Sequence, residues 1–496
     1  MKLFFGRCDR RCDHNPVQAF APACRAVLAM LLALLLAGCG TQPTATRPAE
    51  RTAPAPSPTV RVTRTTPAAT AATQPVRNIL IEPGELDGVQ VVFWHPWSGA
   101  MGEALEQAVL AFNRENEYGI KAESVFQGNY NELFAQVRAA LAEGDPPGLT
   151  VAPIYEIAAW QMEGSAVVDL QPYVEDARWG FSPADQADFF PVFWDQDLVE
   201  EQRLGLPAQR SGQVLLYNSS WAEELGFSAP PETPEEFKEQ ACAAAQANRL
   251  DGDTSNDATG GWAINTAPSA FLPWLSSFGA TVVNPSGDGY RFNTPQTEAA
   301  LAFLKELYDA GCAWETPTEY AGVEFAGRKA IFVTGAVADL PHINAELERA
   351  DNPDEWTVLP FPSPRRQPAI GVYGPSFVLL EGTPEEQLAA WLLATWLASP
   401  EQQAGFVEAG STFPTRESAL ARLDEFAAGH PQWAAAQSLL EYAQAEPAYP
   451  SWDTVRWVIG DVGTQVFRYY FTADRIPATL KLMDETAAEL HARSGE

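Results

Sequence analysis

The 496-residue sequence is poor in basic residues, with 32 Lys and Arg against 64 Asp and Glu and a formal net charge of −32 at pH 7. The first 77 residues hold 10 of the basic and 3 of the acidic residues, which leaves 22 and 61 for the rest of the chain. Because phosphate binding needs clustered positive charge, the sequence predicts no nucleic-acid partner. The same acidity disfavours a strongly anionic ligand.

The sequence also lacks the short motifs of common hydrolases and nucleotide-binding sites. It has no Gly-x-Ser-x-Gly, no His-Glu-x-x-His and no phosphate-binding loop. No apolar run after residue 39 has the length of a membrane-spanning helix. We therefore predict no catalytic residue and no enzyme activity. An exported enzyme stays an alternative, because 61 acidic residues include pairs that a glycosidase could use.

The first 39 residues have the pattern of an export signal. Five basic residues lie among the first 25, an apolar run follows at 26–37, and the run ends in Leu36-Ala37-Gly38-Cys39. Leu-Ala-Gly-Cys resembles the bacterial lipobox, whose cysteine receives the lipid. We predict a signal peptide at 1–38, lipid attachment at Cys39 and a protein anchored at the outer face of the cytoplasmic membrane. An ordinary signal peptide with a chance cysteine is the alternative.

The segment after the anchor has the composition of a tether. At 40–77, 25 of 38 residues are Thr, Pro or Ala, so the segment cannot bury a core, and we predict a disordered tether over 39–86. Beyond it only Cys242 and Cys312 remain. An even pair in an oxidising compartment predicts one disulfide, with two buried free thiols as the alternative.

The remaining chain alternates short apolar runs with helical patterns, which predicts an α/β fold with mostly parallel strands. We expect strands at 89–94, 149–154, 213–217, 330–333, 356–359 and 376–380. At 100–116, Met101, Leu105, Val109 and Phe112 share one helical face. Thr-Pro-Glu-Glu at 233–236 and at 383–386 marks two helix starts as capping boxes with proline at the first position.

Six segments follow one another in a recognisable order after residue 88. They lie at 91–99, at 206–207 with 215–218, at 230–237, at 325–331, at 390–391 with 399–402, and at 413–416, and the first is Val-Val-Phe-Trp-His-Pro-Trp-Ser-Gly. Together they resemble family 1 of the extracellular solute-binding proteins, the type that includes maltose-binding protein. The resemblance implies a monomer with a two-lobed, type II periplasmic-binding-protein-like fold and no cofactor. It also implies a carbohydrate held between the lobes and delivered to the permease of an ABC importer.

The resemblance places the lobe boundaries as well. Hinge crossings are expected at 208–214, at Pro360 and at 413–420. The first lobe would then consist of 87–208 and 360–412, and the second lobe of 209–359 and 413–496. Because a ligand in the cleft contacts both lobes, its binding would favour their closed arrangement.

Binding a sugar requires aromatic rings for its C–H faces and fixed polar groups for its hydroxyls. The loops that the resemblance places at the cleft carry both kinds of side chain. The predicted contacts are Trp94, His95, Trp97, Ser98, Tyr155, Gln209, Arg210, Ser211, Trp274, Thr334, Gly335, Tyr373, Ser411 and Trp452. A hydrogen-bonded loop histidine is the alternative for His95, and a purely structural role in the hinge is the alternative for residues 209–211.

The sequence departs from the maltose-binding pattern at one point. Ala336 and Val337 stand where a stacking tryptophan is expected, which argues against an extended oligosaccharide. The first strand and loop also resemble the glycerol-3-phosphate-binding members. A glycerophosphodiester held by Arg210 or Arg416 is therefore the alternative ligand, and a sensor module that presents its ligand to a receptor is the alternative role.

One loop spaces oxygen ligands as a calcium site does. Asp251, Asp253, Ser255 and Asp257 alternate along it, but Asn256 occupies the place of the usual glycine. These four residues are a candidate site for structural Ca²⁺, and an Asx-rich turn is the alternative.

Overall fold

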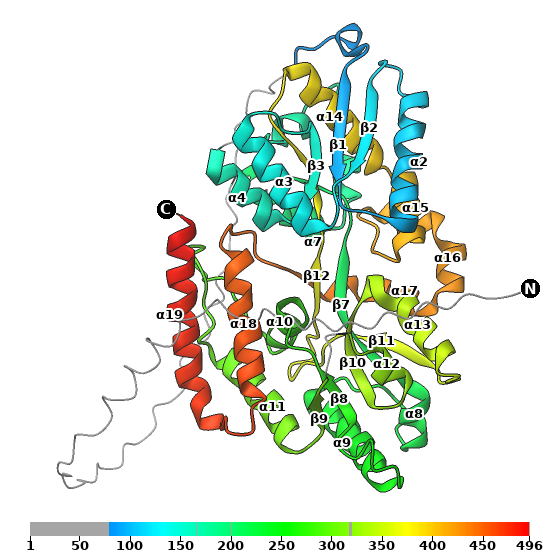
Figure 1. The fold of residues 1–496 in the computed structure, drawn as a ribbon, viewed down its shortest axis with the longest axis vertical. Helices are drawn as coiled ribbons and strands as arrows, with labels where there is room; N and C mark the ends of the chain where they lie inside the picture. The colour runs from blue at the N-terminus through cyan, green and yellow to red at the C-terminus, as the bar shows by residue number, and fades with distance from the viewer. Residues whose placement is uncertain (1–78, 165, 200, 317–319, 496) are drawn as a thin grey trace, which may run out of the picture. The chain divides into compact units, whose positions relative to one another are not determined.

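The computed structural model describes residues 79–164, 166–199, 201–316 and 320–495 (Figure 1). The predicted signal peptide, the Cys39 anchor and residues 40–78 of the predicted tether lie outside the described residues. The predicted end of the disordered tether at 86 is wrong, because residues 83–86 form a short helix and Ile81 and Leu86 are buried in the core of the first lobe. Within the described part of the chain, no helix has both the length and the apolar character needed to span a bilayer. The described chain forms two α/β lobes, each built on its own sheet.

The first lobe contains a five-stranded sheet in the order β2-β1-β3-β13-β6. Its strands are β1 (Gln90–His95), β2 (Lys121–Phe126), β3 (Leu149–Ala152), β6 (Leu206–Pro207) and β13 (Ser376–Leu379). Five longer helices belong to this lobe: α2 (Gly99–Glu115), α3 (Tyr130–Glu143), α4 (Ile154–Gly164), α14 (Pro384–Leu397) and α15 (Pro400–Gly410) (Figure 1). Shorter elements are η1 (Pro83–Leu86), α5 (Gln171–Val174), α6 (Pro183–Ala187), α7 (Pro191–Gln196), β4 (Leu198–Val199) and β5 (Gln202–Arg203).

Local sequence accounts for these helices. α2 buries the predicted face, including Leu105 and Phe112. α14 begins at the predicted capping box, where the Thr383 hydroxyl accepts a hydrogen bond from the Glu386 N–H over 3.3 Å. Trp391 of α14 is fully buried and donates its indole N–H to the Trp179 carbonyl over 2.8 Å, so this tryptophan belongs to the core.

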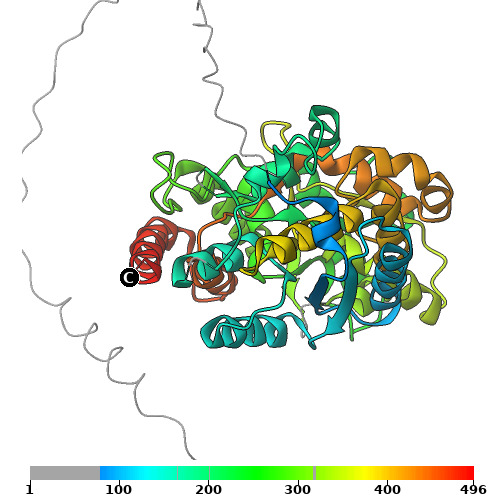
Figure 2. The ribbon, with the colours of Figure 1, turned by 90° about the horizontal axis from the view of Figure 1, so that it is seen from above.

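The second lobe contains a seven-stranded sheet in the order β14-β12-β7-β10-β8-β9, with β11 also paired to β7. Its strands are β7 (Ser211–Asn218), β8 (Gly260–Ile264), β9 (Ala313–Glu315), β10 (Ala330–Ala336), β11 (Trp356–Leu359), β12 (Ile370–Tyr373) and β14 (Ala443–Ala445). Its main helices are α9 (Pro234–Leu250), α10 (Pro268–Ser277), α11 (Pro295–Asp309), α13 (Leu340–Arg349), α17 (Pro431–Ser438), α18 (Trp452–Val466) and α19 (Ile476–Ser494). The shorter ones are α8 (Ser219–Glu224), α12 (Gly322–Ala326) and α16 (Asp424–Gly429) (Figure 2).

The expectation of mostly parallel strands is wrong at β7 and β13. β7 is antiparallel to β10, β11 and β12, and β13 is antiparallel to β3 and β6. The reason lies in the connections between the lobes. β6 runs toward the second lobe and β13 returns from it, while β7 enters that lobe and β12 leaves it, so each pair points in opposite directions.

In the described part of the chain, three segments cross between the lobes. They lie at 208–210 between β6 and β7, at 374–375 between β12 and β13, and at 411–416 after α15, where Phe413 bridges Arg210. The crossing expected at Pro360 is wrong. Pro360 does end β11, but a Phe361–Ala369 bridge turns the chain back into the same sheet as β12. Residues 360–373 therefore belong to the second lobe.

Gly374 fits the observed crossing for a steric reason. Its φ is +151°, and a Cβ at this position would lie 2.2 Å from the Gln209 carbonyl oxygen. A side chain at residue 374 would therefore force the first and second crossings apart.

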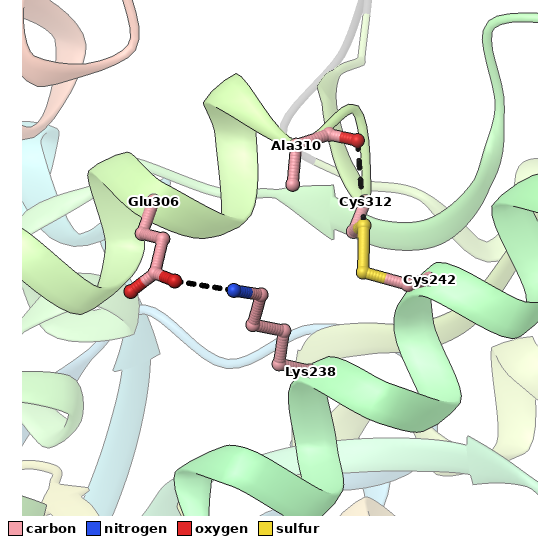
Figure 3. The surroundings of a disulfide bond; sticks show 5 residues. All are labelled: Lys238, Cys242, Glu306, Ala310 and Cys312. Atoms are coloured by element: carbon pink, nitrogen blue, oxygen red, sulfur yellow. Dashed lines mark hydrogen bonds and ion pairs between the residues drawn. A yellow bond between two sulfur atoms is a disulfide. The ribbon is translucent and has the colours of Figure 1, made fainter.

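The two cysteines of the second lobe form a disulfide, the pairing that the sequence predicts. Cys242 of α9 and Cys312, just before β9, have Cα atoms 4.5 Å apart (Figure 3). Lys238, one turn earlier in α9, forms an ion pair with Glu306 of α11 (Figure 3). The disulfide holds α9 against the start of β9 at the edge of the sheet, and the ion pair holds α9 against α11.

Candidate functional site

A cleft of about 810 Å³ lies between the lobes and is bordered by all three crossings. The first lobe contributes the loop after β1, the first turn of α3 and the start of α4. The second lobe contributes β7, the end of β10, the start of α10, and two residues near the C-terminus, Glu446 and Arg456. The volume falls within the range of roughly 300–1,000 Å³ that is typical of small-molecule sites.

Eight of the fourteen predicted contact residues line this cleft. They are Trp97, Ser98, Tyr155, Gln209, Ser211, Thr334, Gly335 and Tyr373. They come from both lobes and from the first crossing, so the structure brings together segments that lie up to 276 positions apart in the chain. Whether each residue contacts a solute stays a prediction.

Two predicted ring contacts are corrected by the structure. Trp274 is fully buried in the second lobe, where its ring lies 5.2 Å from those of Trp262 and Phe361. Almost every residue of α10 is buried, so the segment that the resemblance places at the cleft belongs to the core at Trp274. Trp452 is also buried, and its indole N–H donates to Glu446 over 2.9 Å. Neither tryptophan lines the cleft.

Four further predicted residues lie behind the lining. Trp94 packs against the core of the first lobe, and Ser411 forms the left-handed C-cap of α15. His95 is buried, its Nδ1 accepts the Trp97 N–H over 3.3 Å, and burial lowers its pKa to about 4. His95 is thus neutral and hydrogen-bonded, as its alternative interpretation expects, but it is the last residue of β1 and not a loop residue.

Arg210 is the fourth residue behind the lining. Its side chain is fully buried in an ion pair with Asp197. The guanidinium also donates to the Pro375 carbonyl over 2.6 Å and to the Ser376 hydroxyl over 2.9 Å. The Arg210 carbonyl accepts the Phe413 N–H over 2.8 Å, so this one residue ties the three crossings together.

Aromatic side chains form much of the cleft wall in the first lobe. The Trp97 indole N–H donates to the Tyr130 hydroxyl over 3.1 Å, and the Trp97 ring packs edge-on against Phe93. Only 7% of Trp97 is exposed, so it is both a wall residue and a core residue. Burial raises the pKa of Tyr130 to about 12, which keeps its hydroxyl protonated and able to donate.

Neutral polar groups face the cleft from the second lobe. The Tyr373 hydroxyl accepts a hydrogen bond from Gln213 Nε2 over 3.0 Å. Among the described residues, Thr334 Oγ1 and Gln213 Oε1 are buried and have no hydrogen-bond partner. Because an unpaired buried polar atom is costly, each of these two lining residues would gain from a hydrogen-bond partner that a bound molecule supplied.

The cleft carries few charges. Of the described residues that line it, the charged ones are Asp339, Glu446 and Arg456. Arg456 lies 3.5 Å from Glu446, and burial raises the pKa of Asp339. Arg416, a proposed anion ligand, is instead paired with Asp185 and Asp188 at 3.3 and 2.7 Å and lies outside the lining.

Several lining residues carried no signal in the sequence. Tyr130 follows β2, which the sequence did not mark as a strand, because its residues include Lys121 and Glu123. Arg456 lies in the middle of α18 and belongs to no motif. A charged residue on the polar face of an amphipathic helix usually faces solvent, so only the tertiary fold could show its position in the cleft.

The carboxylates of the candidate calcium loop accept hydrogen bonds from within the loop. Asp251 accepts hydrogen bonds from the Asp253 N–H and the Asn256 amide over 2.7 and 2.8 Å, and Asp253 accepts from the Ser255 N–H over 2.9 Å. These are the contacts of an Asx-rich turn. Across the described ranges, His, Cys, Asp and Glu side chains form no group of three or more that could hold a metal ion.

Comparison with known proteins gives a family and a fold. The family model described as bacterial extracellular solute-binding protein matches residues 107–439. The sugar-binding protein MalE of Xanthomonas citri has a TM-score of 0.70 at 20% identity, over 82% of this chain and 98% of its own. The cyclic alpha-maltosyl-1,6-maltose binding protein of Arthrobacter globiformis has a TM-score of 0.68 at 18% identity, over 82% and 100%.

UgpB of Mycobacterium tuberculosis, solved in complex with glycerophosphocholine, has a TM-score of 0.65 at 16% identity, over 82% of this chain and 98% of its own. A search of curated proteins finds no match to the chain. The structural matches agree with the two-lobed fold described above.

Proposed function

The chain belongs to the bacterial extracellular solute-binding proteins, and we propose that its interlobe cleft captures a neutral carbohydrate. The observation that carries this proposal is the lining of the cleft. The first lobe lines the cleft with aromatic residues such as Trp97 and Tyr130, and the second lobe lines it with neutral hydrogen-bonding residues such as Thr334 and Gln213. A sugar has apolar faces and a hydroxyl rim, and this combination of groups is complementary to it.

The rest of the proposed role follows from family membership and from the N-terminal sequence. We infer that the protein is a lipoprotein attached through Cys39 at the outer face of the cytoplasmic membrane. It would act as a monomer that delivers its solute to the permease of an ABC importer, without a cofactor and without catalysis. The sugar-binding names of two structural neighbours support the ligand class.

A glycerophosphodiester is the second candidate ligand, supported by the complex of the Mycobacterium tuberculosis protein. The charges of the cleft favour the sugar. Arg210 and Arg416 are both engaged by carboxylates outside the lining, and Arg456 lies beside Glu446. A phosphate group would therefore have to compete with a carboxylate that is already in place.

The test is a thermal-shift screen followed by calorimetry on the purified protein. The panel contains glucose, maltose, maltotriose, a polyol and glycerophosphocholine. A ligand at 100 times its Kd stabilises the folded protein by about 2.7 kcal/mol, which is a clear shift in Tm. We expect a mono- or disaccharide to give the shift, and a response to glycerophosphocholine alone would contradict the proposed ligand class.

Thr334→Val tests the site itself. It replaces a buried, unpartnered hydroxyl by a methyl group of similar size, so the unliganded protein should keep its Tm. Loss of one hydrogen bond to the sugar should weaken binding by roughly 2- to 10-fold. Thr395→Val in α14, whose hydroxyl donates to the Leu392 carbonyl, is the matched control and should leave Kd unchanged.

A further inference from the structure

Two side chains from opposite lobes meet in the cleft. Tyr155 lies in the first turn of α4 in the first lobe, and Arg456 lies in α18 of the second lobe. The Arg456 guanidinium donates a hydrogen bond to the Tyr155 hydroxyl over 3.0 Å. Figure 1 shows α4 and α18 to one side of β7 and β12, the strands that lead to the crossings. The lobes are therefore connected by more than their covalent crossings.

We propose that Tyr155 and Arg456 form an interlobe clasp that holds the cleft closed on the side of α4 and α18 before a solute arrives. The proposal rests on the solute-binding function above, because it concerns the closure of the same cleft. In it Arg456 is a positioning residue that joins the lobes and does not serve to bind an anion.

The second lobe fixes Arg456 in the required orientation. Its other terminal nitrogen donates to the Ser269 hydroxyl over 3.0 Å, and Glu446 lies 3.5 Å from the guanidinium. Glu446 is in turn held by the Trp452 indole N–H. Because the planar guanidinium is already oriented, little side-chain entropy is lost when it reaches Tyr155. This arrangement also gives the buried Trp452 a role next to the cleft.

Tyr155 of the first lobe also makes apolar contact with the second lobe. Its ring packs against the hydrophobic core of the second lobe, and the Arg456 guanidinium carbon lies 5.7 Å from the centre of that ring. Burial raises the pKa of Tyr155 well above its ordinary value, so the hydroxyl stays protonated and accepts the bond as a neutral group. The clasp thus combines one hydrogen bond with apolar contact across the lobe boundary.

The consequence is a shifted equilibrium between open and closed lobes. One net hydrogen bond is worth a roughly 2- to 10-fold change in a population ratio. Tyr155→Phe removes only the hydroxyl and should raise the ratio of open to closed molecules by that factor in the absence of any solute. Tyr173→Phe is the matched control, because the Tyr173 hydroxyl donates to Gln387 of the same lobe over 3.1 Å and lies outside the cleft lining.

The experiment measures the distance between the lobes by pulsed electron resonance. Spin labels are attached to ketone-bearing residues at positions 121 and 481, which are exposed on the first and second lobe, so that native cysteines are untouched. We expect the open population to rise in Tyr155→Phe and in Arg456→Lys, and the double variant to show no further rise. Tyr173→Phe should resemble the unaltered protein.

Several results would overturn the clasp: an unchanged distance distribution in Tyr155→Phe, an equal shift in Tyr173→Phe, or additive shifts in the double variant. An unaltered protein that is already fully open without solute would overturn it as well. Since no ligand is present, these outcomes are independent of whether the cleft binds a sugar. The ligand screen can fail while the clasp stands, and the reverse is equally possible.

Discussion

Arg210→Met is the most direct test of how the lobes are joined. The buried guanidinium bonds to Asp197, to the Pro375 carbonyl and to the Ser376 hydroxyl, while the Arg210 carbonyl accepts the Phe413 N–H. Methionine has a similar length and no charge, so it fills much of the space and makes none of the side-chain bonds. The buried carboxylate of Asp197 then loses its partner.

The magnitude follows from the burial of both partners, whose side chains are 0% exposed. Removing one member of a buried ion pair typically costs about 3–5 kcal/mol, because the remaining charge stays buried without compensation. The Ser376 hydroxyl would still donate to Asp197 and recover only part of this cost. We expect Arg210→Met to lower the free energy of unfolding by about 3–5 kcal/mol.

Urea unfolding followed by tryptophan fluorescence measures the effect. Arg468→Met is the control, because Arg468 and Glu315 are 43% and 40% exposed and such a pair contributes at most about 1 kcal/mol. Arg210→Met combined with Asp197→Leu removes both charges and should be more stable than Arg210→Met alone. Equal losses in Arg210→Met and Arg468→Met would refute the view that the buried pair organises the crossings.

Three further predictions follow from the sequence and the fold. Cys39→Ser should abolish labelling with radioactive fatty acid, and normal labelling of that variant would contradict the lipobox assignment. Non-reducing peptide mapping should recover Cys242 and Cys312 as one linked peptide, and reduction should lower stability by up to about 4 kcal/mol for a loop of 70 residues. Since burial lowers the pKa of His95 from 6.5 to about 4, stability should be lost as pH falls from 6.5 toward 4. The expected loss in the free energy of unfolding is about 3 kcal/mol. It is measured as the change of the unfolding midpoint with pH, and this change should be smaller in His95→Asn.

Local signals were sufficient to predict much of the fold. The capping box at Thr383 and the spacing of Leu105 and Phe112 depend on neighbours within a few residues, and both appear as expected. The position of the second crossing was not predictable in this way. Pro360 ends a strand, but which sheet receives the next strand depends on long-range pairing between Val372 and Gly212.

Part of the candidate site was predictable because it too depends on local sequence. Residues that directly follow a strand, such as Trp97 and Tyr155, reach the cleft because strand ends gather there. Trp274 was misassigned because the resemblance places its segment at the cleft but does not show which face of the helix turns toward the core. Tyr130 and Arg456 were missed because their positions depend on how whole helices pack.

The contacts of Arg210 and Arg456 bear on both the proposed ligand and the proposed clasp. Arg210 binds Asp197 at the crossings, and Arg456 binds Tyr155 across the cleft, so both hold the lobes together. A ligand phosphate that recruited Arg456 would have to separate it from Tyr155 and Glu446, and this would weaken the closure that retains the ligand. A sugar can instead use Thr334 and Gln213 without disturbing the clasp. Closure and capture are therefore compatible for a neutral solute, and they oppose each other for an anionic one.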